Sequence, residues 1–104
     1  MASLWFRTAN ITFDSVTAPL SRFKAVMATR MQSGGFTNVV NHDAEVAGGR
    51  GGGWTSMAPL HRVDLGGRRQ EFILVIMCAA DSVDVAKSNT SDVFHMLSWN
   101  DGLW

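Results

Sequence analysis

The run Phe72-Ile73-Leu74-Val75-Ile76-Met77-Cys78-Ala79-Ala80 decides the fold class of this 104-residue chain. Nine successive apolar residues, several of them β-branched, predict a strand that is buried on both of its faces. The run is too short to span a bilayer as a helix. We therefore expect residues 72–80 to form the central strand of a sheet.

Three further segments have the composition of strands. Residues 4–13 are rich in aromatic, β-branched and threonine residues, although either face of this strand could be the buried one. Residues 36–40 form a short strand candidate. Residues 54–65 alternate polar and apolar side chains, and Pro59 confines this strand to an edge or a bulge. Gly66-Gly67 predicts a hairpin turn between this strand and the central one.

Two segments predict helices. In residues 16–33, one apolar face is formed by Val16, Leu20, Phe23, Met27 and Met31. Gly34-Gly35 is expected to end this helix. A second helix begins after Asp81-Ser82, and Ser88-Asn89-Thr90-Ser91 could break it in two, because these residues are poor helix formers.

These elements predict a single α+β domain over residues 1–104. The expected order is β-α-β-β-β-α, with an antiparallel sheet of three to four strands and two helices packed on one face. Residues 41–53 are expected to form a glycine-rich loop, and residues 99–104 a short C-terminal tail. Such an architecture leaves the second apolar face of the central strand without a cover.

The composition favours a second copy as that cover. Only 17% of the residues are charged, and the chain contains four tryptophans and six phenylalanines. This is little charge for a monomer of this size, so we expect a homodimer. The formal net charge of zero argues against a protein built mainly to bind nucleic acid phosphates.

The remaining composition constrains the compartment and the chemistry. A lone cysteine, Cys78, excludes an internal disulfide and a multi-cysteine zinc site, and it lies in the most apolar segment. The N-terminal residues lack the pattern of a secretory signal. We expect a cytoplasmic protein that is not inserted in a membrane and that holds no metal or cofactor.

Glycine and arginine residues form the most conspicuous polar segment. Residues 48–53 lack the Lys-Ser/Thr ending of a phosphate-binding loop, so a flexible loop or a lid anchored by Trp54 is the better interpretation. An RNA-binding surface is a further hypothesis, and its residues would be Arg50, Arg62, Arg68 and Arg69. The helix–three strands–helix succession resembles double-stranded-RNA-binding domains, but the second helix is acidic and lacks their lysine cluster.

Histidines supply the weak catalytic candidates. His95 is expected on the last helix, one position off its apolar face, with Asp92 one turn earlier as a possible carboxylate partner. His42 and His61 have no second histidine at a spacing that would bind a metal.

Three functional hypotheses follow. The first is a homo-oligomeric domain that offers an apolar small-molecule pocket or a protein-interaction surface, with Trp54, His95 and Trp99 as ligand-binding residues. The second is a small enzyme resembling the dimeric α+β barrels, with His95 and Asp92 as catalytic residues; this rests on fold analogy alone. The third is the RNA-binding module.

Overall fold

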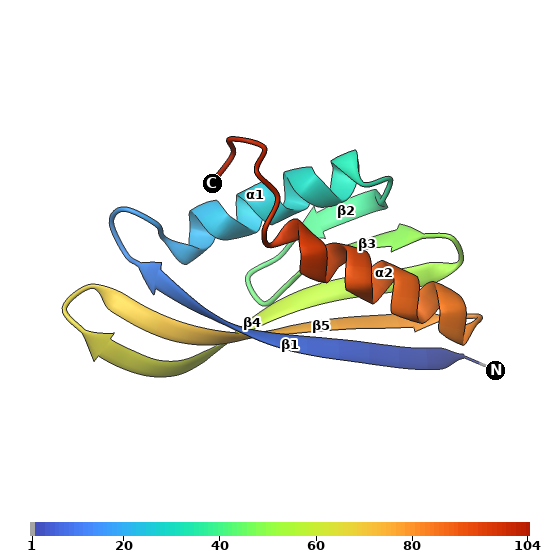
Figure 1. Cartoon of the computed structure of the whole chain (residues 1–104), viewed down its shortest axis with the longest axis horizontal. Coiled ribbons are helices and arrows are strands. Elements are labelled where there is room, and N and C mark those ends of the chain that lie inside the picture. The colour runs from blue at the N-terminus through green and yellow to red at the C-terminus, as the bar shows by residue number, and fades with distance from the viewer. Residues whose placement is uncertain (1) are drawn as a thin grey trace.

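The computed structural model describes residues 2–104. Its sheet is a single antiparallel one, in which the long strand β1 and the long hairpin β4–β5 are extended by the shorter hairpin β2–β3 (Figure 1). The elements, in chain order, are β1 (Ser3–Asp14), α1 (Leu20–Ser33), β2 (Thr37–Asn41), β3 (Val46–Arg50), β4 (Gly53–Gly66), β5 (Arg69–Ala80) and α2 (Val83–Met96).

The α+β class and the antiparallel sheet are confirmed, but the predicted strand number is wrong. The sheet has five strands in the order β1-β5-β4-β3-β2, and the element order is β-α-β-β-β-β-α. The predicted central strand lies inside the sheet as β5, paired with β1 along one edge and with β4 along the other. The predicted hairpin is present, since β4 ends at Gly66 and β5 begins at Arg69.

The additional strand is β3, which lies inside the predicted glycine-rich loop. The prediction of a loop over residues 41–53 is wrong because tertiary packing overrides the weak strand propensity of glycine. A Cβ at Gly48 would lie 3.0 Å from a methyl group of Val39, so a larger residue would fit this position beside β2 only if Val39 shifted. Two short turns remain: residues 42–45 connect β2 to β3, and Gly51 and Gly52, both with positive φ, connect β3 to β4.

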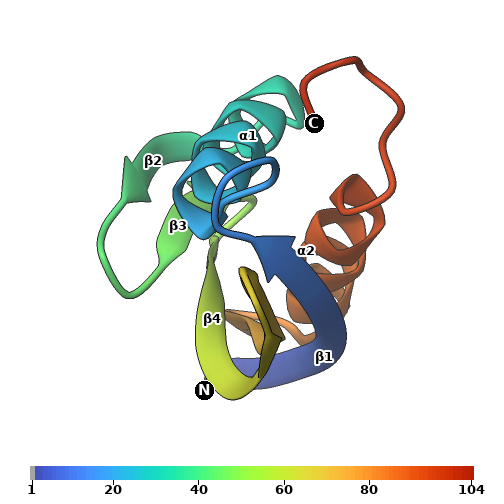
Figure 2. The ribbon, with the colours of Figure 1, turned by 90° about the vertical axis from the view of Figure 1, so that its left-hand side faces the viewer.

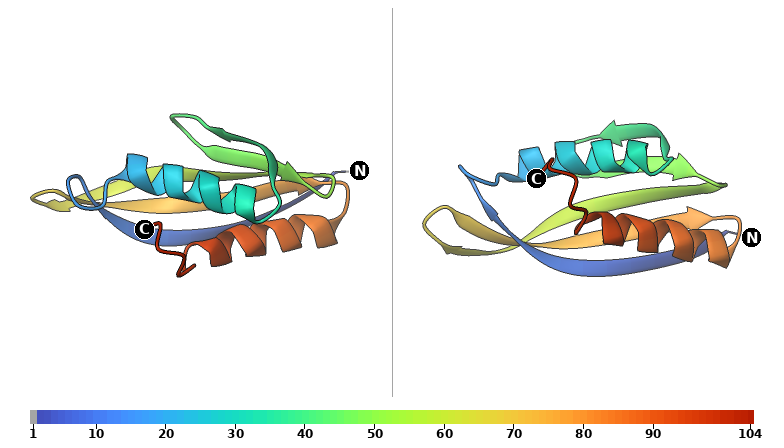
Figure 3. Two further views of the ribbon diagram at one scale, coloured as in Figure 1. Left: turned by 90° about the horizontal axis from the view of Figure 1, so that it is seen from above. Right: turned by 45° about the horizontal axis from the view of Figure 1, so that its top comes forward.

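Both helices cover the same face of the sheet (Figure 2; Figure 3). Helix α1 lies over β2 and β3, and α2 lies over β1, β4 and β5. Helix α1 starts at Leu20 rather than near residue 16, because Pro19 at the N-cap has extended backbone and Asp14 bonds through its backbone to Ala18. Within residues 2–104, no helix is long and apolar enough to cross a membrane.

Helix α2 is continuous, although a break was expected at residues 88–91. The Ser82 side chain accepts a hydrogen bond from the N–H of Val85 and caps the first turn. Asn89 and Thr90 are buried and hydrogen-bonded: the Thr90 hydroxyl donates to the Ala86 carbonyl, and the Asn89 amide donates to the Arg50 carbonyl. Tertiary contacts therefore stabilise this helix where its intrinsic propensity is low.

The core fills the space between the two helices and the covered face. Alternate residues of β5 point into it, and Leu74, Ile76 and Cys78 are fully buried there. The helices contribute Phe23, Met27, Met31, Val93 and Met96.

The C-terminal segment packs back onto α1 (Figure 2). Arg30 is buried, and its guanidinium bonds the carbonyls of Met96 and Trp99 and both carboxylate oxygens of Asp101. The ring of Trp104 makes edge contacts with Phe23 and Phe13. The predicted tail is thus anchored to the helical layer.

Candidate functional site

The sheet face opposite the helices is built from the alternate residues of each strand. Residues that are paired across antiparallel strands point to the same face. The register therefore forms rows of side chains: Leu4, Ala79, Trp54 and Gly49 in the first, and Phe6, Met77, Ser56, Ala47 and Val40 in the second. Two further rows are formed by Thr8, Val75 and Ala58, and by Asn10, Ile73 and Leu60. We call this surface the open face.

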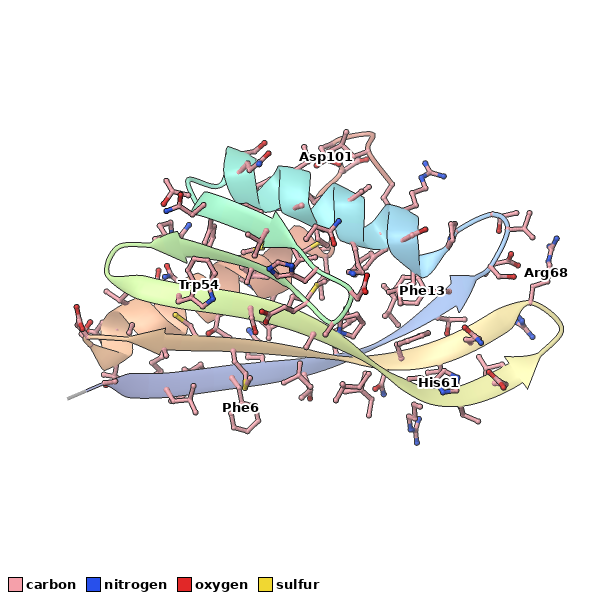
Figure 4. All side chains as sticks on the ribbon, turned by 180° about the vertical axis from the view of Figure 1, so that it is seen from behind. Phe6, Phe13, Trp54, His61, Arg68 and Asp101 are labelled. Atoms are coloured by element: carbon pink, nitrogen blue, oxygen red, sulfur yellow. The ribbon has the colours of Figure 1, made fainter. Side chains whose placement is uncertain are left out.

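The open face is mostly apolar and is exposed along β1, β5 and β4, whereas Ala47 on β3 is fully buried. Leu4 and Phe6 are 64% and 62% exposed, and Trp54, Leu60 and Met77 are also exposed. Figure 4 shows Phe6 projecting from β1 away from the body of the molecule. The four rows contain no charged residue. The first charge lies beyond them, where Glu71 accepts a hydrogen bond of 2.8 Å from Arg62.

A shallow, open hollow lies along the start of β1. It has a volume of about 290 Å³ and is lined by Leu4, Trp5 and Phe6. Two of these three residues belong to the open face, whereas Trp5 points to the helix side and contacts Lys87. The hollow is therefore part of the sheet edge rather than a closed ligand pocket.

The three predicted ligand-binding residues are not brought together. Trp54 is paired with Ala79 and belongs to the open face. His95 is exposed on α2, which covers the other face, and Trp99 lies in the C-terminal segment that follows this helix. The structure thus forms no common pocket from these residues.

The predicted His95–Asp92 pair has a different arrangement. The Asp92 carboxylate accepts a hydrogen bond from Arg50, and the ring of His95 is tilted by 60° against the ring of Phe94, with the centroids 6.0 Å apart. Arg50 also donates to Asn89 and to the carbonyl of Gly34, both at 2.9 Å. The hydrogen bond that a general base would need from a carboxylate partner is thus made by Asp92 to Arg50 rather than to the imidazole of His95.

The same contacts bear on the predicted RNA-binding arginines. Arg50 lies over the ring of Phe36 and ties β3 to both helices, so it is a structural residue. Arg62 bonds Glu71, and Arg68 lies 3.4 Å from Asp14 at the hairpin tip. Figure 4 shows Arg68 at this tip, far from Trp54.

Asp14, the acidic partner of Arg68, is held in its charged form. The N–H groups of Val16 and Thr17, together with Arg68, keep the pKa of Asp14 below its ordinary value. The carboxylates neutralise most of the predicted basic group, which weakens its attraction for phosphates.

The other titratable candidates have structural surroundings. Cys78 is fully buried in the core, as the apolar strand predicts. His61 pairs with Asp64 on the exposed hairpin. Lys24 is buried and bonds the carbonyls of His42 and Asp43, so it closes the β2–β3 turn onto α1. No group of three metal-ligating side chains occurs among residues 2–104.

The sequence-based prediction missed Leu4 and Phe6 as surface-forming residues. Their alternation with Trp5 and Arg7 left the buried face of β1 undecided, because apolar residues occupy both faces of this strand. The structure shows which face of β1 is buried. Phe13 is buried on the helix side, so the even-numbered residues of β1 lie on the open face.

Comparison with protein families, with curated proteins and with solved structures finds no significant match to this chain.

Proposed function

We propose that this chain is a protein-interaction module that forms a homodimer by packing its open face onto the open face of a second copy. The observation that supports this proposal is the set of uncharged, mostly apolar rows on a sheet whose other face is already filled by two helices. Single exposed apolar residues are common on monomers, but contiguous apolar patches are typical of interaction sites.

The absence of charge on the four rows favours a second copy as the partner. An uncharged apolar surface excludes water best against another such surface, and this chain supplies one itself. In a two-fold symmetric dimer the same patch of both copies forms the interface, so an apolar patch automatically faces an apolar patch. Two sheets packed face to face would form a β-sandwich with about 10 Å between them.

The size of the patch is sufficient for a dimer. Strands lie about 4.8 Å apart and rise about 3.3 Å per residue. The four rows span three to five strands between Leu4 and Asn10 and therefore cover roughly 400 Å² in plan. Protruding side chains raise the accessible area toward the about 800 Å² that each partner buries in a standard interface. Burial of a side chain such as Phe6 contributes roughly 2 kcal/mol.

A matched pair of variants tests the proposal. Met77→Asp places a charge in the middle of the second row, whereas Val83→Asp places the same charge at the exposed start of α2, outside the open face. Light scattering after size-exclusion chromatography should give a dimer for the unaltered chain and for Val83→Asp, and a monomer for Met77→Asp. A dimer that survives Met77→Asp would contradict the proposed interface.

A further inference from the structure

The outer edge of β1 has unpaired backbone groups at known positions. The N–H and C=O of Asp14 both bond Ala18, at 3.2 and 3.0 Å, while the N–H of the next residue, Ser15, bonds Arg68 at the start of β5. The N–H and C=O of one strand residue point to the same side, and this side alternates along the strand. Because β1 pairs with β5 without a register shift, its even-numbered residues direct their backbone groups away from β5.

These outward residues are Leu4, Phe6, Thr8, Asn10 and Thr12, and all five are exposed. The hollow beside Leu4, Trp5 and Phe6 lies along the same stretch. A long, exposed edge strand is a template for the addition of another strand, which gains main-chain hydrogen bonds and side-chain contacts together.

Two cations flank this edge on the helix side. The guanidinium of Arg7 lies 3.8 Å from the centroid of the Phe94 ring, and the Lys87 ammonium lies 4.6 Å from the centroid of the Trp5 ring. Neither cation has an acidic side chain within salt-bridge distance among residues 2–104. The aromatic rings hold both charges beside the edge and leave them available to an anionic partner.

We propose that the outer edge of β1 binds an extended acidic peptide segment by strand addition. The two cations disfavour a second copy at this edge, because antiparallel pairing of β1 with itself about Phe6 would place Arg7 of each copy opposite Trp5 of the other, and so beside the Lys87 ammonium that lies over that ring, without a compensating carboxylate. The edge lies in the plane of the sheet and is distinct from the open face, so this inference does not rest on the homodimer.

The pleat of β1 specifies the sequence pattern of the ligand. Side chains of an added strand alternate between the two faces of the sheet. Those on the open side meet Leu4 and Phe6 and should be apolar, whereas those on the helix side meet Arg7 and Lys87 and should be acidic. An alternating apolar–acidic segment is therefore the ligand that this edge fits.

The first experiment compares two fluorescein-labelled peptides by anisotropy at low salt. One is Ser-Val-Glu-Val-Glu-Val-Glu-Ser, and the other has lysine at each glutamate position. We expect the acidic peptide to bind about tenfold more tightly, since exposed ion pairs contribute about 0.2–1 kcal/mol each and the lysine peptide replaces attraction by repulsion. Reversal of both charges in Arg7→Glu/Lys87→Glu should invert the order.

A second experiment separates strand addition from simple charge attraction. Thr8→Pro removes an outward N–H without removing a bond to β5, and proline is tolerated on an edge strand. This substitution should weaken binding of the acidic peptide about tenfold. Thr8→Val, which keeps the N–H, should leave binding of the peptide unchanged. Of two acidic peptides N-methylated at alternate positions, the one whose methyl groups face β1 should lose binding and the other should retain it.

Three results would overturn the proposal. These are equal binding of the acidic and lysine peptides, no binding of the acidic peptide at about 1 mM, and equal binding of the two N-methylated peptides. The last comparison uses the unaltered chain, so a folding defect in a variant does not affect it.

Discussion

Phe6 and Met77 lie directly opposite each other in the β1–β5 ladder, and both side chains are exposed on the face that carries neither helix. Met77 lies in β5, which is bonded on both of its edges, and Phe6 lies in the edge strand β1, which pairs with β5 without a register shift. The scaffold therefore holds two large apolar side chains in fixed positions toward the solvent. Such rigid presentation reduces the entropy that an interface would otherwise lose on binding.

The Arg50 cluster is predicted to stabilise the fold. Arg50→Ala removes hydrogen bonds to Gly34, Asn89 and Asp92 and the stacking on Phe36, and it leaves buried polar groups without partners. We expect the free energy of unfolding to fall by about 2–3 kcal/mol in urea titrations.

Arg69→Ala is the matched control for this prediction, because Arg69 is exposed near the hairpin tip. Its free energy of unfolding should change by less than about 0.5 kcal/mol. Equal effects of the two substitutions would show that the Arg50 contacts do not stabilise the chain.

Gly53 is predicted to tolerate no side chain. A Cβ there would lie 3.0 Å from the amide nitrogen of Asn89 and 3.0 Å from the sulfur of Cys78, both of which are buried. Gly53→Ala should lower the free energy of unfolding by about 1–3 kcal/mol through overpacking. In Gly49→Ala the nearest atom is in the Trp54 ring, at 3.4 Å, so its cost should be smaller. The same urea titration measures both, and a larger cost at Gly49 would contradict the packing described.

Attachment of the C-terminal segment is predicted to depend on pH. Hydrogen bonds from Arg30 hold the pKa of Asp101 below its ordinary value. A lowered pKa in the folded chain means that the stabilisation is present above the unfolded value of about 4 and is lost as the pH falls through the folded value. The indole resonance of Trp104, which contacts Phe23, should therefore shift toward its solvent-exposed position only in acid.

Asp101→Asn removes the charge at every pH, and the Trp104 resonance should then lose this acid transition. A variant that keeps the transition would assign the pH dependence to another carboxylate, with Asp14 as the alternative because its pKa is also lowered.

Much of the fold was predictable from short-range patterns. The nine apolar residues of β5 and the paired glycines after β4 indicated a strand and a hairpin, which the structure contains. The failures arose where tertiary contacts override propensity. Gly48 is a strand residue because it pairs with Thr55 of β4 and packs closely against Val39, and Asn89 continues a helix because it bonds the Arg50 backbone.

For the candidate site, the sequence predicted that one face of the sheet is uncovered, but not which residues form that face. An apolar β5 with helices on one side predicted an uncovered surface, but Leu4 and Phe6 could be assigned to it only from the register with β5. The individual residues singled out for chemistry depended on side-chain proximity, which spacing does not determine. Asp92 is one helical turn from His95 and nevertheless bonds Arg50 from another element.

The most direct test of the proposed dimer uses Met77 as a probe of the open face. It is exposed, whereas Met27, Met31, Met57 and Met96 are buried in the core. Hydrogen peroxide should therefore oxidise Met77 before these four, and mass spectrometry can follow its sulfoxide. The account predicts that the Met77 oxidation rate falls several-fold as the protein concentration rises and the dimer forms, and that Trp54→Asp abolishes this protection. A Met77 oxidation rate that is independent of protein concentration would contradict the account.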